Sequence, residues 1–231
     1  MPSKSARYGE EEAAEGSAFS FIPTFSLERD LIEEGFSLIA GVDEAGRGSL
    51  AGPLSVGLVM YDASFILTNI RGIPGINDSK KLTPCRRTAA LDVIRRHSLT
   101  ATSIMVNHRV IDRLNVNGAT EYAILNLLKF LPVKPDILLL DGNFSFNLGI
   151  PVRSILKGDE RSTSIASASI AAKVRRDAVL DTFDSLYPGY NFKRNKGYGT
   201  REHIRAIAAA GCSPIHRRSY EPVKSMFPGK S

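Results

Sequence analysis

The chain has 231 residues, of which 43% are hydrophobic, and carries 30 Lys and Arg against 24 Asp and Glu. This length predicts one domain that buries its own core without disulfides or a structural metal. Its two cysteines, Cys85 and Cys212, lie far apart, which excludes a disulfide framework and a thiolate zinc site. No apolar run approaches the ~18 residues of a membrane span, and no secretion signal is recognisable. We therefore expect a cytoplasmic protein.

Charge is distributed unevenly along the chain. Residues 1–36 carry three basic and eight acidic side chains, whereas residues 191–231 carry nine basic and two acidic ones. The first 20 residues are small, polar and acidic, as is typical of a disordered leader. A body this basic favours a polyanionic partner such as nucleic acid, although solubility alone could also explain the charge.

The elements expected in the first half begin with a short helix at residues 27–34, capped by Ser26. Strands follow at 37–42 and 54–61, separated by a glycine-rich turn, and then a loop at 71–81. Thr83-Pro84 opens a helix that runs to about His97, with its arginines, Arg87 among them, outside the apolar stripe. A strand at 99–106 ends this half.

The second half alternates helices and strands. Helical periodicity covers residues 117–130, and strands are expected at 136–140 and 151–156. A long helix at 162–187 begins with Ala, Ser and Ile, small enough to let it lie close to a neighbour. A basic loop at 189–199 and a short helix at 200–210 follow. This layout predicts an α/β fold with a mixed sheet flanked by helices, in one domain at 21–188 with a small basic C-terminal extension at 189–231.

Acidic residues fall where the expected strands end. Asp43 and Glu44 follow the first strand, Asp141 follows a buried strand, and Asp159 precedes the long helix. Because strand ends converge in an open α/β sheet, these carboxylates should meet, and they would repel one another unless a hard divalent cation such as Mg²⁺ or Mn²⁺ neutralised them. Taken singly, Asp141 or Asp159 also fits an ordinary turn or a solvated loop. Neighbouring strand residues face opposite ways, so Asp43 and Glu44 serve one site only if the chain turns at Glu44.

Two further segments have the composition of an anion-binding surface. The turn Gly46-Arg47-Gly48 allows close approach of the backbone to a ligand, and Ser79, Lys80 and Lys81 lie in a loop suited to phosphate. In the basic loop, Tyr198 and other aromatic residues alternate with cations such as Arg194 and Lys196, as in a nucleic-acid groove. The alternatives are solvated loops, and for Tyr198 a ring that packs against the body.

Together these segments resemble the ribonuclease HII family, the type 2 ribonucleases H. The resemblance rests on blocks in family order: Ile39-Ala40-Gly41-Val42-Asp43-Glu44-Ala45-Gly46-Arg47-Gly48, Asp78-Ser79-Lys80-Lys81-Leu82, Leu140-Asp141-Gly142, Lys157-Gly158-Asp159, Ile165-Ala166-Ser167-Ala168-Ser169-Ile170-Ala171-Ala172-Lys173-Val174 and Lys196-Gly197-Tyr198-Gly199-Thr200. They cover roughly residues 37–220.

The resemblance implies an RNase H-like fold and an endonuclease. It would cleave RNA in RNA–DNA hybrids and incise 5′ to single ribonucleotides in duplex DNA, leaving 3′-hydroxyl and 5′-phosphate ends. By the resemblance, Asp43, Glu44, Asp141 and Asp159 hold Mg²⁺ or Mn²⁺, the Gly-Arg-Gly turn recognises the ribonucleotide 2′-hydroxyl, and Tyr198 senses the junction. We expect a monomer. A non-catalytic nucleic-acid binder and a metal phosphatase for small phosphoesters remain as alternatives.

Overall fold

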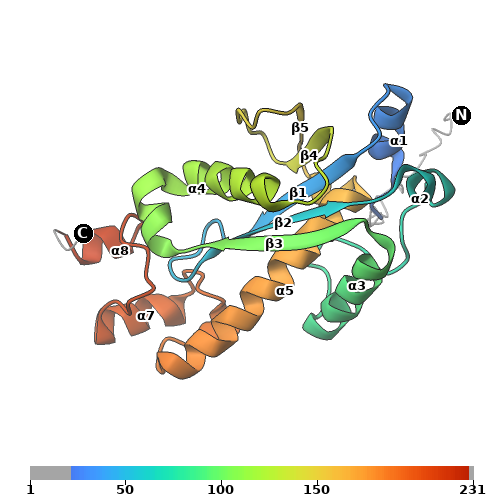
Figure 1. Ribbon diagram of the computed structural model, residues 1–231. Coiled ribbons are helices and arrows are strands. Elements are labelled where there is room, and N and C mark those ends of the chain that lie inside the picture. The colour runs from blue at the N-terminus through green and yellow to red at the C-terminus, as the bar shows by residue number, and fades with distance from the viewer. Residues whose placement is uncertain (1–21, 229–231) are drawn as a thin grey trace, which may run out of the picture.

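The computed structural model describes residues 22–228, so the acidic leader expected at residues 1–20 lies outside the described residues. A five-stranded mixed sheet in the order β3-β2-β1-β4-β5 forms the centre (Figure 1). Its strands are β1 (Ile39–Ala45), β2 (Leu54–Met60), β3 (Thr100–Val106), β4 (Ile137–Asp141) and β5 (Val152–Ile155). The first three pair antiparallel, and β4 and β5 continue the sheet parallel to β1. The mixed α/β fold expected from the sequence is confirmed.

Helices cover both faces of the sheet. They are α1 (Ser26–Glu33), α2 (Ala63–Thr68), α3 (Pro84–His97), α4 (His108–Phe130), η1 (Gly158–Glu160), α5 (Thr163–Leu186), α6 (Phe192–Asn195), α7 (Arg201–Ala210) and α8 (Val223–Met226). In Figure 1, α4 lies on one face and α5 with α3 on the other. None of the helices in the described part of the chain combines the length and apolar character needed to cross a membrane.

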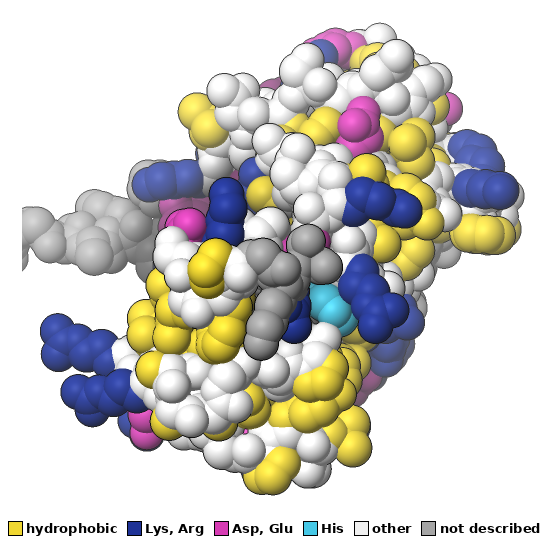
Figure 2. All heavy atoms as spheres, turned by 90° about the vertical axis from the view of Figure 1, so that its left-hand side faces the viewer, with side chains coloured by type: hydrophobic (Ala, Val, Ile, Leu, Met, Phe, Trp, Pro, Cys, Tyr) yellow, Lys and Arg dark blue, Asp and Glu magenta, His cyan; other side chains and the backbone are white. Residues whose placement is uncertain are grey.

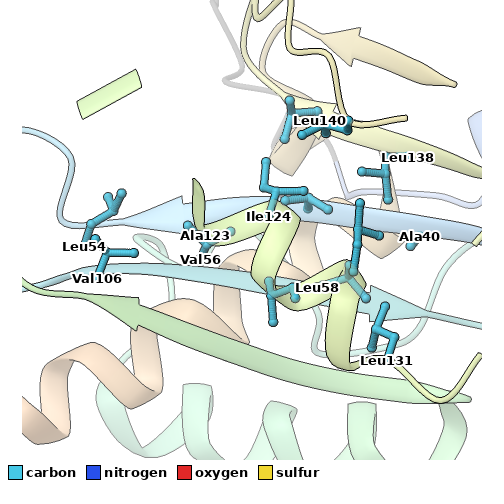
Figure 3. Close-up of a cluster of buried hydrophobic side chains, with 14 of the residues drawn as sticks. Ala40, Leu54, Val56, Leu58, Val106, Ala123, Ile124, Leu131, Leu138 and Leu140 are labelled. Atoms are coloured by element: carbon cyan, nitrogen blue, oxygen red, sulfur yellow. The ribbon is translucent and has the colours of Figure 1, made fainter. Parts of the chain in front are cut away.

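The two faces of the sheet are packed differently. Side chains from β1, β2 and β4 meet α4 in a conventional apolar core, of which Leu58, Ile124 and Leu140 are members (Figure 3). On the other face α5 lies against backbone. A Cβ on Gly41 would lie 2.2 Å from the carbonyl carbon of Ser164, and one on Gly57 would lie 2.1 Å from the carbonyl oxygen of Ala168. The small residues at the start of α5 thus permit the close approach expected from the sequence.

The C-terminal segment packs beside the sheet through its own apolar cluster. Phe192 and Ile207 are fully buried there together with Leu180 from the end of α5. Thr200 caps α7 by accepting a hydrogen bond from the N–H of His203 at 3.2 Å. Figure 1 places α7 and α8 at the end of the molecule where α5 finishes.

Several boundaries differ from the sequence-based expectation. Helix α1 starts at Ser26 itself, which therefore does not cap it. Helix α4 starts at His108, nine residues before the expected start. Asn115, at φ +56°, interrupts it and accepts hydrogen bonds from the N–H groups of Asn117 and Gly118, so the second segment carries the cap that periodicity detected. Arg87 is buried rather than outside the apolar stripe.

Candidate metal centre and nucleic-acid surface

Three carboxylates meet at the edge of the sheet where β1 and β4 end. Asp43, Asp141 and Asp159 each offer an oxygen, and these oxygens all lie within 4.8 Å of one another. Asp43 and Asp159 are buried, whereas Asp141 is partly exposed. The expected convergence of these three acids is therefore present.

The register of the sheet explains which acids meet. Val42 pairs with Leu140 in the parallel β1–β4 ladder, so Asp43 and Asp141 follow at adjacent positions. Val42 and Leu140 belong to the core under α4, and alternation then turns both acids towards the α5 face. Glu44 remains within β1, so its side chain leaves the strand on the other side from Asp43, yet it lies close enough for its charge to raise the pKa of Asp43. The turn that would have brought Glu44 beside Asp43 begins only after Ala45, and Glu44 is not part of the three-oxygen group.

Asp159 is brought to this edge by a tight turn before α5. Lys157 adopts a left-handed conformation at φ +53°, and the N–H of Gly158 donates to Asp141 Oδ1 at 2.6 Å. A Cβ on Gly158 would lie 2.5 Å from Ile165 Cδ1, so a larger residue here would have to displace that side chain. Lys80 Nζ lies 3.2 Å from Asp159 Oδ2, and the two side chains form an ion pair.

Burial and mutual repulsion raise the pKa values of Asp43 and Asp141. Burial raises the pKa of Asp43 well above its usual value, and the charges of Glu44 and Asp141 raise it further. Burial, reinforced by Asp159, also raises the pKa of Asp141. The site therefore holds more negative charge than its surroundings stabilise, which is the electrostatic condition a divalent cation relieves.

Glu44 adds an unsatisfied oxygen close by. Burial raises its pKa to about 7, against the opposing charge of Arg47, whose Nη1 lies 3.7 Å from Oε1. Its Oε2 is buried and has no hydrogen-bond partner among the described residues. An all-oxygen donor set with an unpartnered buried carboxylate oxygen fits Mg²⁺ or Mn²⁺, both of which prefer oxygen ligands.

The Gly-Arg-Gly turn is held from beneath by a buried arginine. Gly46 has φ +90°, and a Cβ there would lie 1.9 Å from Nε of Arg176. The Gly46 carbonyl accepts a hydrogen bond from the Ser49 hydroxyl at 2.8 Å. Gly48 is exposed with no atom within 4 Å of a Cβ position. Within residues 22–228 the N–H groups of Arg47 and Gly48 have no acceptor, so two backbone donors at this turn are unpaired.

Arg47 connects this turn to α4 and to the C-terminal segment. Its guanidinium contacts Asn117 and lies 5.0 Å from the centre of the Phe144 ring. Its carbonyl accepts hydrogen bonds from Arg217 and from the Tyr220 hydroxyl, each at 2.9 Å. The turn is thus fixed by its backbone while its outer N–H groups stay accessible.

Tyr198 lies beside the same arginine. Its side chain is 40% exposed, and the Arg176 guanidinium carbon is 5.6 Å from the ring centre. The N–H groups of Leu50 and Ala51 both donate to the Gly197 carbonyl, joining the Tyr198 loop to the end of the glycine-rich turn. The ring is therefore supported on one side and open on the other.

The remaining residues expected to bind nucleic acid differ in whether they are exposed and in which residues they contact. Lys80 and Lys81 bridge to Asp159 and Glu160 at the three-acid edge. Ser79 is buried and its hydroxyl lies 2.9 Å from that of Ser169, so it does not face solvent. Lys196 pairs with Asp181, and Arg194 lies 3.5 Å from Glu202 on the exposed surface.

Asp177, an acid on α5, is paired with cations and does not belong to the three-oxygen group. Its carboxylate lies 2.9 Å from Arg87 and 2.7 Å from Lys173. Its neighbour Arg176 turns inward and is fully buried. The spacing of Ala172, Arg176 and Leu180 along one helical face signals this inward position.

Sequence reasoning also missed a group of buried polar residues around the Tyr198 loop. Arg217, His203 and His216 have side chains that are at most 2% exposed. Their neighbours in the sequence include Glu202 and Arg218, so no local pattern indicates that they are buried.

Comparison with known proteins agrees with this geometry. The family model described as Ribonuclease HII matches residues 40–223. A Ribonuclease HII from Caldicellulosiruptor saccharolyticus is 46% identical over 196 residues, which cover 85% of this chain and 93% of that protein. The crystal structure of ribonuclease H2 from Pyrococcus horikoshii superposes with a TM-score of 0.69 at 25% identity, covering 82% of this chain and 96% of that one. A structure of Bst-RNase HIII in complex with Mn²⁺ has a TM-score of 0.57 at 17% identity, covering 82% and 69%.

Proposed function

Because the chain belongs to the ribonuclease HII family and is an RNase H enzyme with the RNase H-like fold, we propose that it incises duplex DNA on the 5′ side of single embedded ribonucleotides as well as cleaving the RNA strand of RNA–DNA hybrids. The observation that carries this proposal is the Gly-Arg-Gly turn, which has two unpaired backbone N–H groups and follows Asp43 and Glu44 in the sequence. The products would carry 3′-hydroxyl and 5′-phosphate ends.

Asp43, Asp141 and Asp159 would hold the cations, with Glu44 completing the set from the neighbouring face. A pair of Mg²⁺ or Mn²⁺ ions, when bound, supplies Lewis-acid activation of water and stabilises charge on the leaving oxygen. The Gly158 N–H orients Asp141 by its hydrogen bond, and Lys80 steadies Asp159. The residues thereby fix the positions of the carboxylate oxygens before substrate arrives, which limits reorganisation during the reaction.

The exposed backbone of the turn suits recognition of the 2′-hydroxyl. That hydroxyl both donates and accepts hydrogen bonds, and it is the chemical group that distinguishes a ribonucleotide inside DNA. The N–H groups of Arg47 and Gly48 are available donors, and Gly48 has room for a ribose to approach the backbone. Tyr198, open on one face, would stack on the sugar next to the scissile phosphate and favour a deoxyribose there.

A basic groove lies elsewhere on the molecule. It has a volume of about 1160 Å³ between the start of α4 and the C-terminal segment, and its lining includes Arg109, Arg113 and Lys224. Figure 2 shows this end of the molecule, where many Lys and Arg side chains stand out from the surface. We assign duplex backbone contact to the extension at residues 189–231 together with this groove, since phosphate contacts supply affinity without sequence preference.

The test incubates the protein with Mg²⁺ or Mn²⁺ and a DNA duplex that contains one ribonucleotide. We expect a single cut 5′ to the ribonucleotide, and no cut in an all-DNA duplex of the same sequence. A duplex that stays intact with both metals while a long RNA–DNA hybrid is cleaved would refute incision at single ribonucleotides. A protein that binds both duplexes and cuts neither would support the non-catalytic alternative.

A further inference from the structure

Two buried histidines behind the Tyr198 loop lie in direct contact. His203 belongs to α7 and His216 to the segment that follows it, and their Nε2 atoms are 3.1 Å apart. They are 0% and 2% exposed. The rings of Tyr190 and Phe192 pack around the pair, with centre-to-centre distances of 5.2 to 6.5 Å.

The partners of the outer ring nitrogens determine where the protons lie. The N–H of Ser213 donates to His216 Nδ1 at 2.9 Å, so Nδ1 is unprotonated and a neutral His216 carries its proton on Nε2. At the other end, His203 Nδ1 lies 2.9 Å from the carbonyl oxygen of Tyr198, which can only accept. His203 therefore carries its proton on Nδ1 and receives a hydrogen bond from His216 through Nε2.

The result is a chain of hydrogen bonds with one direction, from the Ser213 N–H through His216 and His203 to the Tyr198 carbonyl. It requires both imidazoles to be neutral. Burial lowers the pKa of His203, and burial together with the His203 charge lowers that of His216 to about 4. His108 from α4 also lowers the pKa of His216.

We propose that His203 and His216 are positioning residues that fix the Tyr198 peptide, and through it the ring, at the place where a ribonucleotide junction is sensed. This inference rests on the proposed role of Tyr198. The loop needs such support because Lys196 and Gly197 are both left-handed, at φ +50° and +80°. The N–H of Thr200 is the second donor to the Tyr198 carbonyl, at 2.8 Å.

Two substitutions of His203 separate its two contacts. His203→Asn keeps an N–H donor near the Nδ1 position and can still reach the Tyr198 carbonyl, but it loses the contact with His216. His203→Gln places its amide near the Nε2 position, so it keeps His216 and loses Tyr198. A purely structural role of the pair would make the two variants equally defective or would favour Gln.

The experiment measures kcat and KM on two substrates, a duplex with one ribonucleotide and a long RNA–DNA hybrid. We expect His203→Gln to lower the single-ribonucleotide rate by about 3- to 10-fold, the size of one neutral hydrogen bond, with a smaller effect on the hybrid. His203→Asn should stay within about 2-fold of the parent. Combined with Tyr198→Ala, His203→Gln should add less than about 2-fold. His97→Gln, an exposed histidine on α3, serves as the control.

A second measurement does not depend on activity. The amide nitrogen of Gly199 shares its peptide group with the Tyr198 carbonyl, so its ¹⁵N chemical shift reports the hydrogen bond from His203. We expect the shift to move in His203→Gln and to stay near the parent value in His203→Asn.

Equal Gly199 shifts in the two variants, or an undiminished Gln effect in the Tyr198→Ala background, would overturn the inference. An unchanged substrate preference in Tyr198→Ala, with the shifts as expected, would instead overturn the proposed role of Tyr198.

Discussion

Two of the buried polar clusters in this molecule handle charge in opposite ways. At the ends of β1 and β4, three carboxylates crowd together with one lysine in contact, and burial and repulsion raise the pKa values of Asp43 and Asp141. Beneath the glycine-rich turn, Arg176 and Arg217 are fully buried, and their contacts are carbonyls, a serine hydroxyl and aromatic rings.

The difference lies in hydrogen bonding. Arg176 donates to the carbonyls of Pro53 and Lys196 and to the Ser49 hydroxyl at 2.7 to 2.9 Å, which offsets much of the cost of burying its charge. The acids have few donors, and Glu44 Oε2 has none among the described residues. A buried cluster whose charged groups all have hydrogen-bond partners stabilises the fold. A buried cluster whose charged groups lack partners can bind a ligand of opposite charge.

The strongest way to test this contrast is Asp141→Asn. The amide still accepts from the Gly158 N–H but supplies no charge to a cation. We expect cleavage to fall by more than about 100-fold, since residues behind metal ligands alone are typically worth 10- to 100-fold. In EDTA the variant should have a higher Tm than the parent, because a carboxylate with a raised pKa is lost. A lower Tm would show that the acids are not in mutual repulsion.

Arg176→Met should instead damage stability. The methionine fills space but leaves buried carbonyls without donors, and we expect a loss of roughly 3 kcal/mol in the free energy of unfolding. Urea denaturation provides the measurement. The exposed neighbour Arg175 is the matched control, and Arg175→Met should change the free energy by less than about 1 kcal/mol. Similar losses at both positions would contradict the inward role of Arg176.

Asp159→Asn and Asp177→Asn sharpen the boundary of the acidic cluster. Asp159 belongs to the three-oxygen group, whereas Asp177 is neutralised by Arg87 and Lys173. We expect a strong loss of rate for the first variant and a weak one for the second, with Asp177→Asn lowering the free energy of unfolding by about 1 kcal/mol. Steady-state cleavage rates and urea denaturation of both variants provide the measurements. A stronger loss of rate for Asp177→Asn than for Asp159→Asn would show that the metal site includes Asp177 instead of Asp159.

The smallest expected effect is a pH dependence at His216. Its folded-state pKa of about 4 lies below the unfolded value, so the unfolded chain binds a proton first as the pH falls. The contribution of His216 is complete above pH about 6.5 and is lost as the pH drops towards 4. The stability difference between the parent and His216→Asn should therefore shrink across this window, as measured by denaturation at several pH values. A constant difference would mean that His216 does not titrate as described.

Sequence reasoning predicted the strands and the meeting of three acids because both depend on local patterns. The apolar residues of β1 and β4 predicted the two strands, and Asp43 and Asp141 follow these apolar residues near the C-terminal ends of the strands. The alternation of side chains along β1 did not predict whether Glu44 lies beside Asp43, because this depends on the residue at which the strand ends and the chain turns. That point is set by Gly46 and the arginine beneath it, a contact between residues 130 positions apart.

The buried cations and histidines could not be predicted in the same way. Arg87, Arg217 and His216 occupy segments that read as polar surface. Only tertiary contacts show that Arg87 donates to a partly buried carboxylate, that Arg217 donates to a carbonyl, and that His216 lies against His203. Polar residues carry no periodic signal of burial, because their burial depends on partners that are distant in sequence.

The backbone contact between α5 and the strands at Gly41 and Gly57 has a consequence for redesign of the enzyme. On this face the distance between α5 and the sheet is set by main-chain atoms, so no change of side chain can adjust it. The distance between Asp43 and the turn before α5 depends on this contact. On the α4 face, spacing is set by interchangeable apolar side chains. A library of hydrophobic substitutions under α4 should yield many active enzymes, whereas one that replaces Gly41 or Gly57 should yield almost none.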